Sequence, residues 1–240
     1  MSPKISVIIP TLNEENYLAR TLDSIKKQKF QDYEVIVSDS GSTDNTAKIA
    51  KSYGAKVITG PKRGPGAGRN LGAKHAQGEL LMFMDSDSVL KSDDMFNAII
   101  ETMNKKDVGG GFFKVKGIGK KSWLYNHFFN TLLELFCLLK KPLTGGYCIF
   151  VDKKSFDALN GFDENIEICE DFDFSWRIIK KLNKKVKYVR KRTVETSTRR
   201  WEHGSLKQPL EYSRAFLNFL LFKKVPKDKF KFKAASELKK

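Results

Sequence analysis

The chain contains few cysteines and no pair of them at metal-binding spacing. Cys137, Cys148 and Cys169 are the three among its 240 residues, and they stand well apart. A sparse, odd number of cysteines argues against a disulfide framework and against a zinc site. We therefore expect them to be buried as small apolar residues in a protein of a reducing cytoplasm.

Long apolar runs are also missing. No stretch reaches the roughly 18 apolar residues that a membrane-spanning helix needs, so an integral membrane protein is not expected. The apolar segment near the start of the chain ends at Pro10, which is too short for a signal peptide, and we expect a cytoplasmic location. With 40% apolar and 30% charged residues, the composition is typical of a globular protein.

Acidic residues are outnumbered by basic ones. The chain has 44 lysines and arginines against 28 aspartates and glutamates, a formal net charge of +16. Such an excess suggests an anionic partner, namely a nucleic acid, nucleotide phosphates or an acidic membrane surface. A lysine-rich solvated surface is the alternative, and we prefer it for most lysines. Because the basic residues are spread over most of the chain, a nucleic-acid-binding function ranks low and no nucleic acid partner is expected.

Short apolar strands and amphipathic helices alternate through the first 90 residues. Strands are predicted at residues 4–9, 33–37, 56–59 and 79–84. A capping-box spacing at Thr11 and Glu14 predicts the start of a first helix, and a second helix continues to Ala50. A third helix is predicted at 69–77, after a flexible glycine-rich loop over 60–68. This alternation predicts an α/β fold with a doubly wound, mostly parallel sheet and helices on both faces.

The second half of the chain is less regular. Strands are predicted at 108–115, 146–151 and 185–189, and helices at 123–139 and 170–182. Beyond Arg192 the sequence becomes basic and aromatic and loses clear periodicity. Because no long linker or internal repeat interrupts the chain, we expect one domain over 1–201 and a C-terminal extension over 202–240.

Polar residues gather in the loops that follow the predicted strands of the first half. In a doubly wound sheet, ligands bind beyond the carboxyl ends of the strands. Four acids and one basic residue fall in these loops, namely Glu14, Asp39, Asp85, Asp87 and Arg69. Turns do not require this much charge, so the sequence predicts a ligand site at that edge of the sheet.

Two acidic pairs suggest specific chemistry. Asp85 and Asp87 follow a strongly apolar strand, and two hard oxygen ligands there suit Mg²⁺ or Mn²⁺ bound jointly with a diphosphate. A capping or turn role is their alternative. Glu170 and Asp171 begin a predicted helix, where a carboxylate can act as general base toward an acceptor hydroxyl. Interaction with the helix dipole is the competing explanation for that pair.

Seven short segments form a recognisable series. In order they are VIIPTLNEE (7–15), VIVSDSGSTDNT (35–46), GRNLG (68–72), MDSD (84–87), TGGY (144–147), GFDE (161–164) and EDFD (170–173). Their order and spacing closely resemble the family-2 glycosyltransferases, which have the GT-A fold. Each motif is modest alone, but the series is highly specific and covers about residues 4–201. The resemblance implies a nucleotide-binding half over 1–90 and an acceptor half over 91–201.

The resemblance implies which residues bind the donor and its metal. The nucleotide sugar, UDP- or GDP-linked, would be bound by Pro10, Thr11, Glu14, Asp39, Arg69, Asp85 and Ser86. Asp85 and Asp87 would hold a divalent metal, Mn²⁺ or Mg²⁺. His203 would close the metal site, although an ordinary surface histidine is about as good an interpretation.

The resemblance also implies catalytic and acceptor-side residues. Asp171, beside Glu170, would be the general base of an inverting single displacement. Gly145, Gly146 and Trp201 would lie on the acceptor side, where the two glycines let an acceptor approach the backbone closely.

One segment departs from the family pattern. Processive members carry a Gln-x-x-Arg-Trp motif, whereas Ser197 stands in the place of the glutamine here. Those members also have membrane-spanning segments. We therefore expect the transfer of a single sugar rather than the synthesis of a polymer.

Two apolar segments bear on the acceptor. Residues 123–139 leave only a narrow polar stripe, and residues 216–222 repeat that apolar character; lysines follow both segments. A helix this apolar is either core or in contact with lipid, and neighbouring lysines suit an anionic bilayer. We expect a glycan or lipid-linked acceptor and peripheral association with the cytoplasmic face of a membrane. Burial of the same surfaces in a homodimer is the alternative.

A haloacid-dehalogenase-like phosphatase is the main rival enzyme. In that class Asp85 would attack phosphorus and Asp87 would act as acid and base. The motif normally belongs to the first strand, however, whereas three strand–helix units precede it here. A dinucleotide-binding oxidoreductase is not expected, because the loop after the first strand lacks the G-x-G-x-x-G pattern.

Overall fold

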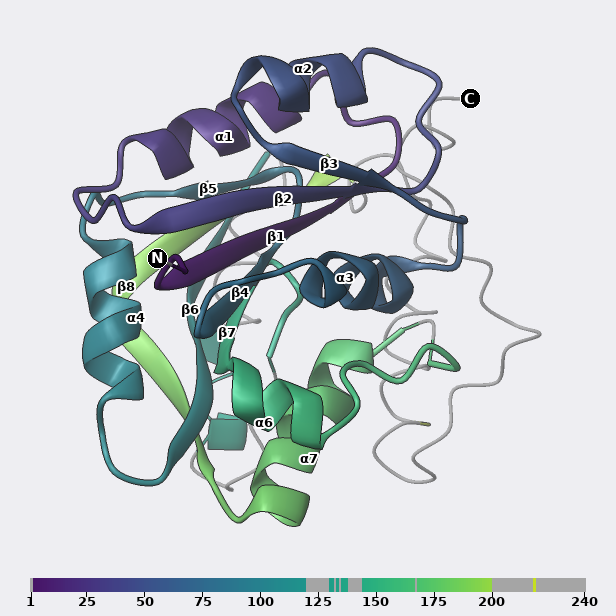
Figure 1. The fold of residues 1–240 in the computed structure, drawn as a ribbon. Coiled ribbons are helices and arrows are strands. Elements are labelled where there is room, and N and C mark those ends of the chain that lie inside the picture. The colour runs from purple at the N-terminus through teal and green to yellow at the C-terminus, as the bar shows by residue number, and fades with distance from the viewer. Residues whose placement is uncertain are drawn as a thin grey trace.

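The computed structural model describes residues 2–119, 130–131, 133, 135–137, 144–166, 168–199 and 218. Within this part of the chain, one eight-stranded sheet carries helices on both faces (Figure 1). In chain order the elements are β1 (Ile5–Thr11), α1 (Leu18–Lys26), β2 (Tyr33–Asp39), α2 (Thr46–Ser52), β3 (Lys56–Thr59), α3 (Pro65–Lys74), β4 (Leu80–Met84), β5 (Ser88–Leu90), α4 (Met95–Met103), β6 (Val108–Ile118), β7 (Cys148–Asp152), α6 (Lys153–Ala158), α7 (Glu170–Leu182) and β8 (Lys185–Ser197).

The strand order is β3-β2-β1-β4-β7-β6-β8-β5. The first four strands in this order are parallel neighbours, and β6 and β8 are parallel as well. β7 runs antiparallel between β4 and β6, and β5 pairs antiparallel with β8. The predicted doubly wound, mostly parallel sheet is therefore confirmed, with a mixed second half. Because β7 is antiparallel to both β4 and β6, the strands β4 and β6 run in the same direction, and β8 runs parallel to β6. The carboxyl ends of β1, β2, β4 and β8 therefore lie at the same edge of the sheet.

The side-chain alternation of β1 divides the core into two layers. Ile5, Val7 and Ile9 belong to a cluster shared with α1, α2 and α4, whereas Ile8 belongs to a cluster shared with α3, α6 and α7. Successive residues of a strand point to opposite faces of a sheet. Both faces of β1 are thus covered by helices, which explains why this strand and β4 are apolar almost throughout.

The predicted capping box at Thr11 and Glu14 is wrong. Thr11 is the last residue of β1, and the first helix begins only at Leu18. A cap at Thr11 would need the N–H of Glu14, but this group donates to Thr46 Oγ1 at 2.7 Å. The Thr11 hydroxyl donates to Asp39 Oδ1 at 3.0 Å. Both capping groups are therefore used by partners from β2 and α2.

Helix α3 begins at Pro65 rather than at Arg69, so part of the segment predicted as a flexible loop is helical. Proline suits the first turn of a helix because its fixed φ is already helical. The glycines of α3 let it lie against β1. A Cβ atom at Gly68 would lie 3.0 Å from Pro10 Cβ, and one at Gly72 would overlap Ile8 Cγ2.

Strand β8 continues to Ser197, beyond its predicted end at residue 189. Its register with β6 jumps between Val189 and Thr193. Such a bulge breaks the alternation on which a strand prediction depends. The continued strand brings the end of β8 to the edge that holds the carboxyl ends of β1, β2 and β4. The structure also contains three elements that the sequence analysis did not predict, namely β5, α4 and α6.

Cys148 and Cys169 are buried as predicted, and burial raises the pKa of both thiols; Cys137 is half-buried. Of the predicted helix 123–139, residues 130–131, 133 and 135–137 are described and helical. Leu133 belongs to the core, whereas Leu135 is 51% exposed. The rest of that segment, and residues 216–222 apart from 218, lie outside the described residues. No helix in the part that the structure describes is long and apolar enough to cross a membrane.

Gly72→Ala should destabilise the protein, because the added methyl group would overlap Ile8 beneath α3. Overpacking of this kind costs about 1–3 kcal/mol. Gly66→Ala is the matched control in the same helix, since its Cβ would meet neighbours only at 3.5 Å or more. That change should leave the free energy of unfolding within about 1 kcal/mol of wild type. Urea unfolding measures both, and equal stabilities of the two variants would contradict the packing argument.

Candidate active site

The polar residues predicted from the loops do meet at one edge of the sheet. Thr11 and Asp39 end β1 and β2 and stand opposite each other in the parallel register. Asp85 and Asp87 lie between β4 and β5, and Asp171 lies in the first turn of α7. The edge therefore combines the ends of three first-half elements with a helix from the second half.

Asp39 is held by three hydrogen bonds. It accepts from Thr11 Oγ1 at 3.0 Å, from the backbone N–H of Ser42 at 2.9 Å and from Ser42 Oγ at 2.5 Å. A carboxylate fixed in this way presents a defined face to a ligand. Pro10, half-buried, lies under α3, and Ser86 is buried with its carbonyl accepting from Thr21 Oγ1 at 2.7 Å. Pro10 and Ser86 thus contribute backbone and packing to the edge.

Arg69 links the two halves of the domain. Its side chain is only 2% exposed. Nη1 donates to Glu170 Oε1 at 2.5 Å, and Nη2 donates to Asp85 Oδ1 at 3.0 Å and to the Gly146 carbonyl at 3.3 Å. The Phe162 ring lies beside the guanidinium, with Cζ 5.4 Å from the ring centroid. The role predicted for Arg69, contact with the nucleotide, stays a prediction.

The electrostatics around Arg69 follow from this geometry. Burial by itself would lower the pKa of Arg69, but the charges of Glu170, Asp85 and Asp171 raise it above its usual value. Burial raises the pKa of Asp171 well above its usual range, and the charge of Glu170 raises it further, whereas Arg69 opposes the shift. A carboxyl group with a raised pKa is suited to proton transfer near neutral pH.

The acceptor-side glycines are tightly packed. A Cβ at Gly146 would overlap Arg69 Nη2, and one at Gly145 would overlap the Tyr147 ring. Thr144 Oγ1 donates to the Asp171 carbonyl at 2.8 Å, which ties this loop to the start of α7. The glycines therefore serve internal packing, and their predicted contact with an acceptor stays a prediction.

Asp85 and Asp87 each contact a different arginine. Asp85, with a side chain 38% exposed, pairs with Arg69, while Asp87, 13% exposed, lies 3.2 Å from Arg199 Nη2. Among the described residues, no group of three or more histidine, cysteine or acidic side chains could hold a metal. Two carboxylates that leave the rest of the coordination sphere to phosphate oxygens and water still fit Mn²⁺ or Mg²⁺. His203 and Trp201 lie outside the described residues.

Arg199 is a site residue that the sequence analysis missed. Its Nη2 donates to both carboxylate oxygens of Glu14, at 2.7 and 2.8 Å, and its Cζ lies 4.0 Å from the centroid of the Tyr17 ring. Burial would lower the pKa of Arg199, but Asp87 and Glu14 raise it. The one available signal was its place beside Ser197 in the segment that departs from the family pattern.

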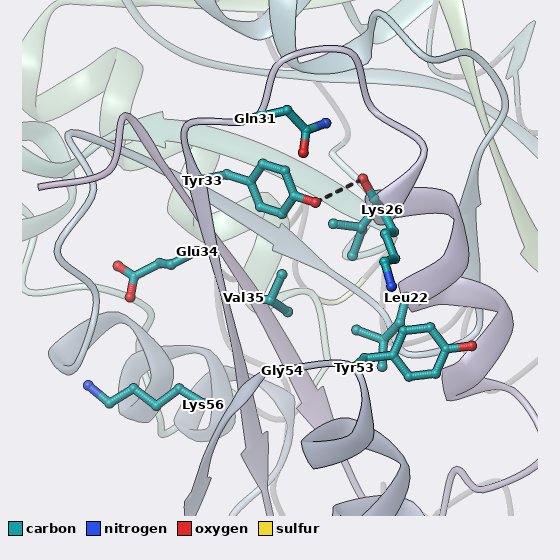
Figure 2. Close-up of a pocket in the computed structure, with 10 residues that line it drawn as sticks. Leu22, Lys26, Gln31, Tyr33, Glu34, Val35, Tyr53, Gly54 and Lys56 are labelled. Atoms are coloured by element: carbon teal, nitrogen blue, oxygen red, sulfur yellow. Dashed lines mark hydrogen bonds between the residues drawn. The ribbon is translucent and has the colours of Figure 1, made fainter.

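A cavity of about 410 Å³ lies away from this edge (Figure 2). It is found at the amino ends of β2 and β3, next to the last residues of α1 and α2. Tyr33, Glu34, Tyr53 and Lys56 line it, and Tyr33 Oη donates to the Ile25 carbonyl at 3.5 Å. None of the predicted site residues lines this cavity.

A doubly wound, mostly parallel sheet with helices on both faces and fixed acids at the carboxyl ends of its strands is an α/β architecture of the GT-A type, and α/β sheets bind ligands at that edge. The model of the family described as Glycosyl transferase family 2 matches residues 6–159, more than half of the chain, so the chain belongs to this family. The resemblance stated from the motifs is therefore confirmed, and membership favours a transferase over the phosphatase alternative.

Two relatives illustrate the similarity. The poly(ribitol-phosphate) β-N-acetylglucosaminyltransferase TarS of Staphylococcus aureus is 38% identical over 103 residues, which cover 40% of this chain and 18% of TarS. The GalNAc(5)-diNAcBac-PP-undecaprenol β-1,3-glucosyltransferase of Campylobacter jejuni is 31% identical over 166 residues, covering 59% of this chain and 53% of that enzyme. These matches span between about a fifth and about a half of the length of the two relatives.

Solved structures share the fold. The mannosyltransferase PcManGT of Pyrobaculum calidifontis, solved with GDP-Man and Mn²⁺, matches with a TM-score of 0.70 and 19% identity over 99% of this chain and 68% of its own. TarS in complex with UDP-GlcNAc matches with a TM-score of 0.65 and 24% identity over 81% of this chain and 58% of its own. At these identities the comparison shows the fold and not the substrate.

Arg69→Met should destabilise the protein, because it leaves buried carboxylates without their partner. Removing one member of a buried ion pair costs about 3–5 kcal/mol. Without the guanidinium the pKa of Asp171 should rise further, so protonation on acidification should relieve part of the loss. Urea unfolding at about pH 8 and about pH 5.5 tests both statements.

The control for this prediction is Arg20→Met. The Arg20 side chain is 64% exposed and lies 3.9 Å from Glu195, so the change should cost no more than about 0.5 kcal/mol. A loss for Arg69→Met no larger than that of the control, or a loss that grows on acidification, would contradict the role of Arg69.

Proposed function

We propose that the protein transfers one sugar from a nucleotide-diphospho-sugar to an acceptor hydroxyl with inversion of configuration. The observation that carries the proposal is the meeting of Asp85, Asp87 and Asp171 at one sheet edge, with Arg69 bonded between Asp85 and Glu170. The guanidinium of Arg69 thus connects Asp85 on the donor side with Glu170 on the acceptor side. Family membership supports the reaction class.

The donor lies over the carboxyl ends of β1 and β2. Thr11 and Asp39 contact the nucleoside, with the Asp39 carboxylate already oriented by its hydrogen bonds. Asp85 and Asp87 would hold Mn²⁺ or Mg²⁺, which would neutralise charge on the departing phosphate. The mannosyltransferase solved with GDP-Man and Mn²⁺ and the UDP-GlcNAc complex of TarS support a metal and a UDP or GDP donor.

Asp171 acts as the general base. The acceptor oxygen attacks the anomeric carbon as the bond from that carbon to the phosphate oxygen breaks, and the hydroxyl proton passes to Asp171. The nucleoside diphosphate leaves with the electron pair of the broken bond. Glu170 Oε1 accepts from Arg69 at 2.5 Å, which holds the carboxylate beside Asp171 in the first turn of α7. Glu170 thus positions the first turn of α7.

Two substitutions separate binding from transfer. Asp87→Ala should abolish metal-dependent donor binding, whereas Asp171→Asn should leave binding intact and reduce transfer by about 10²–10⁴-fold. A thermal-shift screen of UDP- and GDP-sugars with and without Mn²⁺ measures binding. A bound donor at about 100 times its Kd stabilises the folded state by about 2.7 kcal/mol. Released nucleoside diphosphate measures turnover.

The same screen shows how the proposal fails. Stabilisation by a nucleotide sugar that is equal in wild type and Asp87→Ala would remove the metal assignment. Transfer by Asp171→Asn at the wild-type rate would remove the base. Hydrolysis of a generic phosphate ester, with no thermal stabilisation by any nucleotide sugar, would favour the phosphatase over the glycosyltransferase.

We also propose a lipid-linked acceptor, reached by peripheral association with an anionic membrane at the cytoplasmic face. The C. jejuni relative supports this, since its name gives a PP-undecaprenol-linked acceptor, and the net charge of +16 is of the required sign. The full chain should float with vesicles containing anionic lipid at low salt and dissociate at about 0.5 M NaCl, while neutral vesicles serve as control. Protein that stays unbound at low salt and sediments as a dimer would favour the homodimer.

A further inference from the structure

Arg199 joins the nucleoside side of the proposed donor site to its metal side. Its Nη2 donates to both oxygens of Glu14 and lies 3.2 Å from Asp87 Oδ2. The Tyr17 ring faces the guanidinium from 4.0 Å. The Arg199 side chain is only 12% exposed. Two acids and an aromatic ring from distant parts of the sequence thus hold one guanidinium, which is unlike an exposed surface ion pair.

The position of Arg199 conflicts with a metal at Asp87. A divalent ion binds a carboxylate oxygen at about 2.1 Å, as Mg²⁺ does, and would place two positive charges a few ångströms from the guanidinium. Arg199 Nη2 lies 3.2 Å from Oδ2, one of the two oxygens through which Asp87 could bind a metal. A metal at Asp87 therefore either takes the Oδ2 atom from Arg199 or binds the other oxygen against the repulsion of the nearby guanidinium.

We propose that Arg199 is an internal counter-ion for Asp87 and Glu14, which the divalent metal must displace. The inference rests on the proposed function, since it takes Asp87 as a metal ligand. Displacement of Arg199 from Asp87 also releases Glu14, the acid on the nucleoside side. Because one movement opens both places, metal and nucleotide bind cooperatively, and metal alone binds weakly.

Mn²⁺ binding to the full-length protein tests the proposal, with the electron paramagnetic resonance signal of free Mn²⁺ as readout. Arg199→Gln removes the charge but keeps an N–H donor, and it should tighten binding of Mn²⁺ alone by about tenfold or more. Arg20→Gln removes the same charge from an exposed site and should change the Kd by no more than about twofold. Added UDP or GDP should tighten Mn²⁺ binding in wild type and do so less in Arg199→Gln.

A second variant keeps the test valid if Arg199→Gln does not fold. Tyr17→Leu removes the ring under the guanidinium and leaves Glu14, Asp87 and Arg199 charged. It should also tighten Mn²⁺ binding, by about twofold to fivefold, because it loosens Arg199. A general electrostatic effect predicts no change for Tyr17→Leu. Thermal unfolding of each variant checks that it is folded.

Unchanged or weaker Mn²⁺ binding in folded Arg199→Gln and Tyr17→Leu would overturn the proposal. Tightening that persists in the double variant Arg199→Gln, Asp87→Ala would overturn it too, because the ion would then be bound elsewhere. In another outcome, wild type binds Mn²⁺ in the presence of UDP or GDP through Asp87 while the variants bind Mn²⁺ no more tightly than wild type. In that case the counter-ion role of Arg199 fails and the proposed metal-dependent function stands. If neither wild type nor variants bind Mn²⁺ with either nucleotide, the metal-dependent function fails with it.

Discussion

The buried guanidinium of Arg69 is the constraint on which the candidate site depends. A charge this deeply buried must find ionic partners, and its partners come from the β4–β5 loop and the start of α7, besides the Gly146 carbonyl. Asp85 and Glu170, from the two parts of the site, are therefore brought together by the need to pair one arginine. The same pairing opposes the rise in the pKa of Asp171 that burial and Glu170 produce. The ion pairs that stabilise the fold thus also set the pKa of Asp171, the proposed base.

A second arginine, Arg199, neutralises two further acids at the same edge of the sheet. Asp85 pairs with Arg69, whereas Asp87 and Glu14 share Arg199. In this state each carboxylate of the predicted metal pair faces a protein cation. The chain has 44 basic and 28 acidic residues, so most of its basic residues lie outside these pairs.

Much of the fold could be predicted because local signals and global structure agree. The strand over Lys56–Thr59 and the helix over Glu170–Leu182 have their predicted bounds, since apolar spacing and flanking polar residues mark them clearly. The errors arose where a distant group takes a local hydrogen-bonding role, or where an irregularity interrupts the pattern of a strand. Glu14 gives its N–H to Thr46 rather than to a cap, and the bulge after Val189 hides the continuation of β8. Arg199 was missed because its partners lie far away in the sequence.

The family can be inferred from the sequence alone, through the order of motifs from VIIPTLNEE to EDFD, and the alternation of apolar segments predicts the doubly wound sheet. The sequence also predicted that acids would collect at the carboxyl ends of the strands. The folded chain is needed to show which acid pairs with which arginine, how deeply Asp171 is buried and that Arg199 contacts Asp87. The physical reason is that hydrophobic periodicity is a local property of the chain. Charge pairing and desolvation depend on distances between residues that only the folded chain brings together.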